Sequence, residues 1–375
     1  MKIIMIGPFP PPIHGMSLAN EILLNHFKKE HFVIFLDTKT SKDIGNFSQQ
    51  GRMSFKRIFN SFFQIFIGTG RIIFSKRFDI VYITPAQSAS GYIKYIPFMW
   101  AAKVKKIPYV IHIHGGYFRV MYDQTNGWKK HLIDRSLNNL AGAIVLGDSL
   151  KYMFEGLIPK DKIFVCQNGV EEEIFATEEE INNKIREFKS DNTLRVVYLS
   201  NLMKEKGILD LIEAIRILKG KNRKIHLDMA GAIEPEIKNE VEKYLKEFPD
   251  EITYHGVVSG NTKKLLLLHN YIFCLPTYYS NEGQPISILE AMACGCAIVT
   301  TDHGGIKDIA REEFSMFVEK QNPNSIAKGI EDAYNNFETI SFKAWKEAKS
   351  KYTQKQFVNR VTEVLFKCSK NKVEK

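Results

Sequence analysis

Short runs of apolar and β-branched residues recur along the whole chain, and helical patterns occupy the stretches between them. Such runs are typical of strands buried on both faces of a parallel sheet and joined by crossover helices. The first half predicts strands at 2–6, 32–36, 80–84, 109–112, 143–146 and 163–166. The second half predicts strands at 195–200, 225–230, 252–254, 272–275 and 297–300. We therefore expect an α/β protein with two doubly wound parallel-sheet domains in tandem.

The two halves are separated by Asn168-Gly169-Val170 and by the acidic, apolar-poor segment 171–192, which predicts a linker and a surface helix. We expect a first domain at 1–168, completed by a C-terminal helix at about 350–375, and a second domain at 169–349. Ligands bind outside the carboxyl ends of strands in such sheets. Two facing domains would therefore enclose a central cleft between those ends.

Length and composition agree with this organisation. The 375 residues suit two domains, and 44% hydrophobic with 25% charged residues is typical of a globular chain. The apolar run before Pro8 is too short for a signal peptide or a membrane span, and no later window reaches the length of a span. Five scattered cysteines without a CxxC pair indicate neither a disulfide framework nor a zinc site and suit a reducing cytoplasm. Cys294 and Cys296 are expected to be small packing residues.

The net charge of +10 is concentrated in the first half of the chain. Residues 1–168 contain 22 basic and 10 acidic residues, a net +12, whereas residues 169–375 contain 30 basic and 32 acidic residues, a net −2. A basic surface favours nucleic acid, membrane or phosphate-bearing partners. The distribution therefore predicts that such a partner meets the first domain.

The segment 44–78 departs from the strand pattern because it has no acidic residue, six basic residues and eight phenylalanines, five of them at helical spacing. Basic residues near an anionic leaflet contribute about 1 kcal/mol each, so this segment predicts reversible binding to an anionic membrane surface. Residues 92–106, which include Trp100, Lys103, Lys105 and Lys106, favour the same hypothesis. The alternative is a core helix with a solvated basic face, because both share this periodicity.

The most informative stretch is 279–295, YSNEGQPISILEAMACG. Pro285 suits the first position of a helix and Gly295 a helix stop, so we expect a helix from about Pro285 to Cys294. Its free N–H groups and its dipole form a site for a diphosphate, and Gly283 allows close approach of the backbone.

Two carboxylates flank that site. Glu282 lies in the loop before the helix, and Glu290 lies about 7.5 Å along the helix axis from Pro285. As hydrogen-bond acceptors they can reach a hydroxyl on each side of a bound diphosphate. We expect Glu282 to contact a sugar and Glu290 a ribose.

Glu282 and Glu290, with seven residues between them in EGQPISILE and with GCAIVTT after, resemble the E-x7-E signature of retaining glycosyltransferase family 4. That family has the GT-B fold, with two Rossmann-like doubly wound parallel-sheet domains facing a central cleft. The resemblance implies that the second domain binds a nucleotide-sugar donor and the first an acceptor. The implied donor-binding residues here are Glu282, Gly283, Gln284, Pro285, Ile286 and Glu290, and Glu282 is also implied in catalysis.

Shorter motifs extend the resemblance over most of the chain. Residues 11–16, PPIHGM, resemble the family's first-strand glycine loop and imply a role for Gly15 at the donor. Residues 109–115, YVIHIHG, resemble the strand end with a sugar-contacting histidine, and alignment from the preceding proline favours His114 over His112 as a catalytic residue. Residues 166–170, CQNGV, resemble the interdomain Asn-Gly-Val. Residues 229–231, MAG, resemble the nucleotide-proximal glycine, which is Gly231 here.

Residues 200–207, SNLMKEKG, resemble the family's phosphate-binding Arg-x4-Lys-Gly loop and imply donor-binding and catalytic roles for Lys206. Asn201 stands where many members have arginine, so one positive charge on the diphosphate is missing. Either Lys206 and the helix N-terminus are enough to bind the diphosphate, or a neighbouring residue takes the place of the missing arginine. The glycine loop also differs, with His14 before Gly15 where a glycine pair is common.

Structural roles remain open as alternatives for several of these residues. His114 can be a buried, hydrogen-bonded core histidine, because strand ends often place histidine beneath a loop. Lys206 can be a solvated turn residue paired with Glu205. Gly15 and Gly231 can be ordinary turn glycines between a strand and a helix.

The chemistry that the resemblance implies can be argued physically. Glycosyl transfer passes through an oxocarbenium-like transition state while the nucleotide diphosphate leaves, so positive donors are needed at the developing phosphate charge. Lys206 and the N–H groups near Pro285 are those donors. The family's retention is attributed to front-face attack assisted by the departing phosphate. No Asp-x-Asp motif occurs, so we expect no metal and no other cofactor.

The expected function is retaining hexosyl or N-acetylhexosaminyl transfer from a UDP-linked donor to a lipid-linked or glycan acceptor. A composition rich in lysine, isoleucine and asparagine suggests an AT-rich bacterial genome, which favours surface polysaccharide such as capsule or lipopolysaccharide. We expect a cytoplasmic enzyme held peripherally at the inner face of the cell membrane, with no nucleic-acid partner. The alternatives are a UDP-sugar 2-epimerase on the same fold and a non-catalytic nucleotide-binding or nucleic-acid-binding protein. No Gly-x-Gly-x-x-Gly opens the first helix, which weakens a dinucleotide site.

Overall fold

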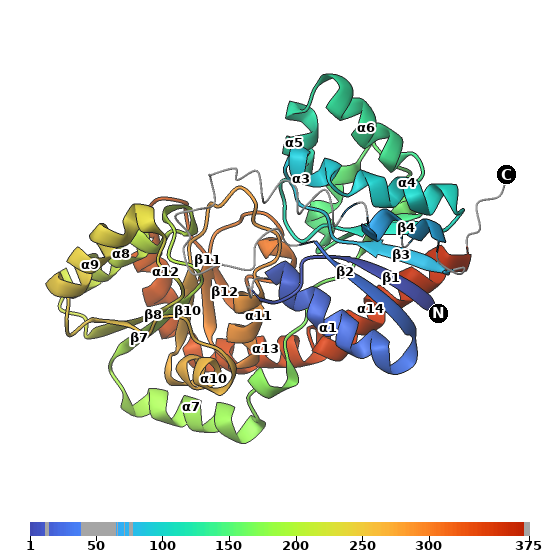
Figure 1. Cartoon of the computed structure of the whole chain (residues 1–375). Helices are drawn as coiled ribbons and strands as arrows, with labels where there is room; N and C mark the ends of the chain where they lie inside the picture. The colour runs from blue at the N-terminus through green and yellow to red at the C-terminus, as the bar shows by residue number, and fades with distance from the viewer. Residues whose placement is uncertain (12–14, 39–64, 66, 71, 75–77, 371–375) are drawn as a thin grey trace. The chain divides into compact units, whose positions relative to one another are not determined.

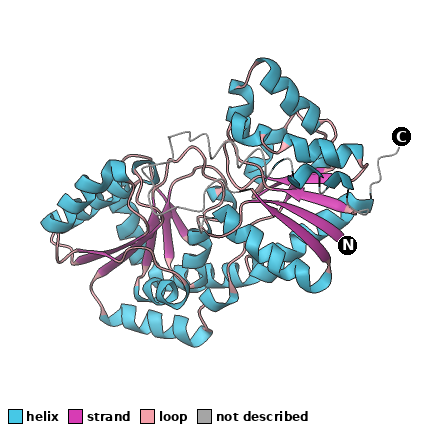
Figure 2. Cartoon of the chain, in the orientation of Figure 1, coloured by secondary structure: helices cyan, strands magenta, loops and turns pink. Residues whose placement is uncertain are grey.

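The computed structural model describes residues 1–11, 15–38, 65, 67–70, 72–74 and 78–370. The chain divides into two compact units, one formed by Met1–Asn168 together with the segment from Lys355, and the other by Gly169–Gln354. Each unit contains one six-stranded sheet enclosed by helices (Figure 2).

The first unit alternates strands with helices along the chain (Figure 1). Its strands are β1 (Lys2–Gly7), β2 (Phe32–Asp37), β3 (Ile80–Ile83), β4 (Tyr109–His112), β5 (Gly142–Val145) and β6 (Ile163–Val165). Its described α-helices include α1 (Gly15–Glu30), α3 (Ala89–Ile93), α4 (Ile96–Val104), α5 (Phe118–Gln124), α6 (Gly127–Leu137) and α14 (Gln354–Lys370), whose first residue belongs to the other unit.

The first sheet is parallel throughout and has the order β2-β1-β3-β4-β5-β6. Alternate residues of β1 face opposite layers. Ile3 and Met5 pack with α1 and α14, and Ile4 and Ile6 pack with α4, α5 and α6. Burial on both faces explains why these strands are continuous apolar runs. The strand order reverses between β1 and β3, which is the topological switch point of this unit.

The second unit repeats the alternation. Its strands are β7 (Leu194–Leu199), β8 (Ile225–Ala230), β9 (Ile252–Tyr254), β10 (Ile272–Leu275), β11 (Ala297–Thr300) and β12 (Ser315–Phe317). Its α-helices are α7 (Glu178–Ser190), α8 (Ile208–Gly220), α9 (Lys238–Glu247), α10 (Gly260–His269), α11 (Ile286–Ala293), α12 (Pro323–Asn335) and α13 (Phe337–Lys351).

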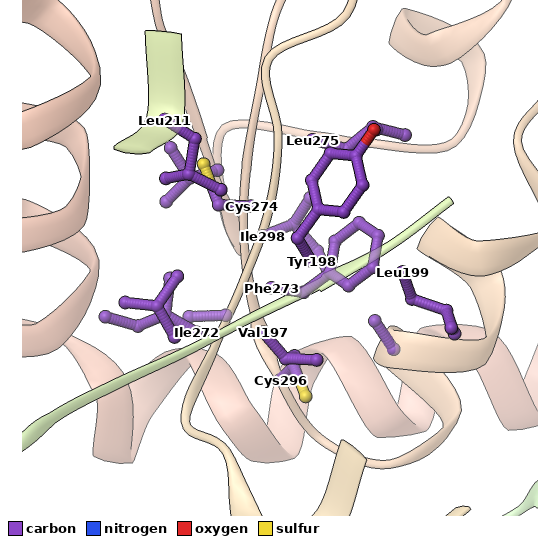
Figure 3. Close-up of a cluster of buried hydrophobic side chains, with 14 of the residues drawn as sticks. Val197, Tyr198, Leu199, Leu211, Ile272, Phe273, Cys274, Leu275, Cys296 and Ile298 are labelled. Carbon is purple, nitrogen blue, oxygen red and sulfur yellow. The ribbon is translucent and has the colours of Figure 1, made fainter. Parts of the chain in front are cut away.

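The second sheet is also parallel throughout, with the order β12-β11-β10-β7-β8-β9. Side chains of its central strands meet those of α8 in one buried cluster, where Figure 3 shows Tyr198, Leu211, Phe273 and Ile298. The strand order reverses between β7 and β10, so the switch point of this unit lies at the middle of its sheet.

The predicted strands agree with the observed ones to within a residue or two at their ends. The edge strand β12 was missed: its residues Ser315-Met316-Phe317 include no β-branched residue, unlike those of the equally short strands β6 and β9. The helix expected from Pro285 to Cys294 is α11, and Pro285 is its N-cap instead of its first residue. The acidic linker contains a helix, α7.

Most of the basic, phenylalanine-rich segment 44–78 lies outside the described residues, including the five phenylalanines at helical spacing. Among the residues that the structure describes, no helix is both long enough and apolar enough to cross a membrane. All five cysteines are buried and free of disulfides.

Candidate functional site

The carboxyl ends of β7 and β10 form the switch point of the second unit, where doubly wound sheets bind ligands. The loop after β7 carries Lys206, and the loop after β10 carries Glu282 and leads into α11. Lys206 and Glu282, which are 76 positions apart in the sequence, therefore meet at the carboxyl end of the sheet.

Gly207 explains why the β7 loop can reach the β10 loop. Lys206 ends a short 3₁₀ turn, and Gly207 follows it in the left-handed conformation at φ 75°. A Cβ at this position would lie 2.3 Å from the carbonyl oxygen of Pro276. Only glycine allows this approach, so it fixes the turn with Lys206 beside the end of β10.

Lys206 and Glu282 form a buried ion pair. Lys206 Nζ donates to Glu282 Oε2 at 2.6 Å, and the two side chains are 12% and 7% exposed. Thr277 Oγ1 donates to the same carboxylate oxygen at 3.0 Å, and Lys206 Nζ lies 5.1 Å from the centre of the Tyr279 ring. Lys206 is therefore a partner of Glu282, and the alternative of a solvated lysine paired with Glu205 is wrong.

This pair leaves hydrogen-bonding capacity for a ligand. An ammonium group has three N–H donors, and the hydrogen bond from Lys206 to Glu282 uses one of them. Among the described residues, both contacts to the Glu282 carboxylate reach Oε2, and Oε1 accepts no hydrogen bond. The pair can therefore present a positive donor and a carboxylate acceptor to the same molecule.

Glu290 forms a second buried ion pair. It lies on α11, and Lys263 Nζ from α10 donates to its Oε1 at 2.6 Å. The two side chains are 13% and 7% exposed. Each glutamate of the E-x7-E stretch is thus paired with one lysine from another element.

The residues between the two glutamates connect the loop to the helix. The carbonyl of Gly283 accepts from the N–H of Gly305 at 2.8 Å, Gln284 is buried, and Pro285 is the N-cap. Ile286 begins α11. The first N–H groups of the helix follow directly after the loop that contains Glu282, as the sequence predicted.

Gly231 follows β8, the strand next to β7, with φ 142°. A Cβ there would lie 1.9 Å from the carbonyl oxygen of Ser200, so glycine is required for the contact between the two strand ends. Asn201 lies in the loop after β7 with its side chain exposed, and its carbonyl accepts from the hydroxyl of Tyr198 at 2.9 Å.

His114 belongs to the first unit, just after β4, and is half-buried. Its ring stacks on that of His112 with centroids 4.0 Å apart. His112 is fully buried and shares a 2.8 Å hydrogen bond with the Tyr82 hydroxyl. Burial holds the pKa of His112 well below its usual range, and the neighbouring His114 lowers it further. The His112 ring is therefore neutral.

Gly15 is the exposed first residue of α1. At the switch point of this unit Asn20 Nδ2 donates to the Pro8 carbonyl at 2.9 Å and to Thr84 Oγ1 at 2.8 Å, and the N–H of Phe9 donates to Asp37 Oδ1 at 3.4 Å. Gly7 lies against the side chains of Asn20 and Thr84: a Cβ added to Gly7 would lie 1.9 Å from Thr84 Oγ1 and 2.6 Å from Asn20 Nδ2.

The structure thus brings together Lys206, Glu282 and the start of α11, with Gly231 at the end of the adjoining strand. Gly15 and His114 lie in the other unit. Sequence reasoning did not find Lys263 or Thr277, because a lone lysine in a helix and a lone threonine in a loop carry no local signal. Within the described ranges, no group of three His, Cys, Asp or Glu side chains is placed to hold a metal ion.

A hollow of about 720 Å³ lies at α13, with Arg311, Lys343, Trp345 and Glu347 among its lining residues. Arg311 and Glu347 pair with each other across 3.3 Å, and their side chains are partly exposed. None of the residues that line this hollow belongs to the loops after β7 and β10, where a doubly wound sheet with this strand order binds its ligand. We therefore locate the candidate site at the switch point of the sheet.

Comparison with known proteins points to the same unit. Residues 178–351 match the sequence model of the family described as "Glycosyl transferases group 1". An uncharacterized glycosyltransferase of Methanocaldococcus jannaschii is 29% identical over 204 residues, which cover 52% of this chain and 51% of that protein. The capsular polysaccharide biosynthesis glycosyltransferase CapM of Staphylococcus aureus is 27% identical over 235 residues, which cover 56% of this chain and 57% of that protein. The matches span little more than half the length of these relatives.

The fold is shared with solved structures at low sequence identity. The crystal structure of Anabaena Alr3699/HepE in complex with UDP matches with a TM-score of 0.73 and 13% identity, over 98% of this chain and 100% of that chain. Together with the two parallel doubly wound sheets, this match confirms the GT-B fold that the sequence predicted.

Proposed function

Because residues 178–351 form a domain of the group 1 glycosyl transferases, we propose that this chain moves a sugar from a nucleotide-diphosphate sugar to a lipid-linked or glycan acceptor. The proposed donor is UDP-linked, the sugar is a hexose or an N-acetylhexosamine, and the anomeric configuration is retained. The proposed setting is bacterial surface polysaccharide synthesis.

The observation that carries this proposal is the Lys206–Glu282 pair at the switch point, directly before the N-terminus of α11. A nucleotide-sugar has a diphosphate and a sugar side by side. Lys206 and the helix N–H groups are suited to the diphosphate, and the open oxygen of Glu282 is suited to a sugar hydroxyl. As the bond to the sugar breaks, negative charge grows on the leaving diphosphate, and these fixed donors stabilise it.

The nature of the donor and acceptor is supported by similarity. UDP is the ligand of the HepE complex, and CapM is named for capsular polysaccharide synthesis. Retention follows from the resemblance of the E-x7-E stretch to retaining enzymes. Lys206 and α11 supply positive charge next to the proposed diphosphate site, so we propose transfer without a metal ion.

The proposed acceptor side is the basic first unit. Helix α4 supports contact with an anionic membrane there: Trp100 and Val104 are 57% and 54% exposed, and Lys103, Lys105 and Lys106 are exposed beside them. Residues 80–122 contain no Asp or Glu. An exposed indole with lysines around it suits the interface of an anionic bilayer. We propose peripheral binding at the inner face of the cell membrane.

The catalytic proposal is tested by supplying candidate nucleotide-sugars and acceptors and following both UDP release and the glycosylated product. Glu282→Ala and Glu290→Ala are expected to lose activity, and Glu338→Ala is the control, because Glu338 forms an exposed ion pair with Lys189 on the same unit. Full activity of both site variants would exclude the site. Conversion of the UDP-sugar to its 2-epimer, without a glycosylated product, would support the 2-epimerase instead.

The membrane proposal is tested by co-sedimentation with vesicles. We expect binding to vesicles containing anionic lipid, weaker binding to neutral vesicles, and a further loss in a Trp100→Ala, Val104→Ala double variant. Equal binding to neutral and anionic vesicles would contradict the electrostatic part of the proposal.

A further inference from the structure

The ion pair between Lys263 and Glu290 has no role in the function described so far. Lys263 lies in the first half of α10, and its Nζ donates to Glu290 Oε1 on α11 at 2.6 Å. Both side chains are nearly buried. A buried carboxylate that keeps its charge requires such a partner, since removing one member of a buried pair leaves an uncompensated charge.

The two oxygens of Glu290 are used differently. Among the described residues Lys263 is the one hydrogen-bonding partner of this carboxylate, and it occupies Oε1. Oε2 accepts no hydrogen bond from the part of the chain that the structure describes. A lysine on one oxygen fixes the plane of the carboxylate and directs the other oxygen to a further donor.

Helix α10 is well anchored for this task. At its C-terminal end Asn270 Nδ2 donates both to the Leu266 carbonyl at 3.0 Å and to Asp228 Oδ2 on β8 at 2.7 Å. Asp228 and Asn270 are both buried. The helix that carries Lys263 is thus tied to the central sheet, and its side chain reaches Glu290 from a fixed position.

We propose that Lys263 is a positioning residue for nucleotide recognition: by holding Oε1 of Glu290 it orients Oε2 to accept a hydrogen bond from a ribose hydroxyl of the donor. This inference rests on the proposed nucleotide-sugar donor and on the expectation from the sequence that Glu290 contacts its ribose. Lys263 itself contacts Glu290 and no substrate atom. Its loss is therefore expected to weaken recognition of one hydroxyl and to leave the remaining nucleotide contacts intact.

The next residue of the same helix provides a matched control. Lys264 is 14% exposed, much like Lys263, and its Nζ lies 3.0 Å from Oε2 of Glu180 on α7. Glu180 belongs to the capping box of that helix with Thr177. Lys263→Met and Lys264→Met thus remove the same group from adjacent positions, and only the first change affects Glu290.

The experiment measures the affinities of the full chain for UDP, 2′-deoxy-UDP and 3′-deoxy-UDP by isothermal titration calorimetry. A hydrogen bond to a charged acceptor is worth about tenfold or more in affinity, so wild type is expected to prefer UDP by about that factor over one deoxy analogue. Lys263→Met is expected to bind UDP about tenfold more weakly and to lose most of this preference. Lys264→Met is expected to keep it.

A second arm tests whether Lys263 acts through Glu290. Glu290→Gln is expected to lose the same preference, and adding Lys263→Met to it is expected to change the ratio of affinities no further. A Lys263→Met variant that keeps the wild-type preference while wild type binds UDP would overturn the inference alone. Absence of UDP binding by wild type would overturn the UDP proposal and this inference with it. If Lys263→Met does not fold, Lys263→Gln is measured against the same expectations.

Discussion

The two units share one architecture and differ in the chemistry at their switch points. Each has a six-stranded parallel sheet whose strand order reverses once. In the first unit the described contacts at the reversal are hydrogen bonds of Asn20 with Thr84 and the Pro8 carbonyl, and of the Phe9 N–H with the Asp37 carboxylate. In the second unit the reversal carries the buried ion pair of Lys206 and Glu282.

The buried titratable groups differ in the same way. In the first unit His112 is held neutral by burial, and its ring contacts the Tyr82 hydroxyl and the His114 ring. In the second unit Asp228 is buried but ionised. Burial would raise its pKa, but hydrogen bonds from His226, His255 and Asn270 outweigh burial and hold that pKa well below its usual range.

This difference shows that the doubly wound fold supplies a place for a ligand and that side-chain charge decides which ligand suits it. The sheet topology alone gives both units a switch point. A diphosphate requires positive donors, and the described residues place a buried lysine at only one of the two reversals. Fold and function are therefore separate conclusions, and the proposed nucleotide-sugar site rests on the Lys206–Glu282 pair of the second unit.

The largest expected effect comes from removing the charge that distinguishes the second switch point. Lys206→Ala is expected to lower turnover by two to three orders of magnitude, about 3 to 4 kcal/mol in the barrier, because a preorganised donor to the leaving diphosphate is lost. Lys189→Ala is the control, since Lys189 forms an exposed pair with Glu338. Initial rates of UDP release measure both, and circular dichroism verifies folding, because the change also leaves Glu282 without its counter-charge. Turnover within a factor of three of wild type would remove Lys206 from catalysis.

A second prediction compares the buried polar networks of the two units. Asp228→Asn is expected to lower the free energy of unfolding by about 2 to 3 kcal/mol, because hydrogen bonds to a buried charge are lost. Asn20→Ala in the first unit is expected to cost about 1 to 2 kcal/mol, because its bonds are neutral. Urea denaturation of the full chain measures both. A larger loss for Asn20→Ala than for Asp228→Asn would contradict the comparison.

Much of the fold could be predicted from the sequence, because buried parallel strands leave continuous apolar runs. Strands such as 225–230 and 272–275 were predicted with their observed bounds. Strand β12 was missed because its three residues, Ser315-Met316-Phe317, include no β-branched residue, whereas the equally short edge strands β6 and β9 contain isoleucine, valine or threonine.

The site was predicted in part. Lys206, Glu282 and Glu290 were chosen from motifs, but the pairing of Lys206 with Glu282 depends on two loops meeting at the switch point, which no local pattern contains. Lys263 was missed for the same reason, because its partner on α11 is 27 residues away and becomes visible only when α10 and α11 are placed. Residue types can be read from spacing, whereas contacts between loops require the topology of the sheet.

A third prediction uses pH to separate the units. The pKa of His112 is lowered in the folded chain, so below about pH 6.5 the unfolded chain takes up a proton that the folded chain does not, and stability falls. The pKa of His226 is raised, chiefly by the hydrogen bond to Asp228, so its stabilising contribution is present below about pH 6.5 and is lost as the pH rises through the raised value.

The measurement is urea denaturation of His112→Asn, His226→Gln and wild type at pH 5.5, 7 and 8. The destabilisation caused by His112→Asn is expected to shrink towards pH 5.5, by up to about 1.4 kcal/mol per pH unit. The destabilisation caused by His226→Gln is expected to shrink towards pH 8. If the destabilisation caused by both variants changed with pH in the same direction, the pKa values of the two histidines would not be shifted in opposite directions.

The smallest expected effect is the coupling energy of an exposed ion pair, with which the buried pairs can be compared. Lys189 and Glu338 lie 2.9 Å apart, compared with 2.6 Å for Lys206 and Glu282, but their side chains are 58% and 49% exposed. Water and salt screen such a pair, so a double-mutant cycle with Lys189→Ala and Glu338→Ala is expected to give a coupling of about 0.5 kcal/mol that decreases in 1 M salt. The same cycle on Lys206 and Glu282 is expected to give a coupling several times larger and nearly independent of salt, because those groups are shielded from solvent. Equal couplings would mean that burial at the switch point adds nothing to the ion pair, and the contrast between the units would then reduce to the presence of a lysine.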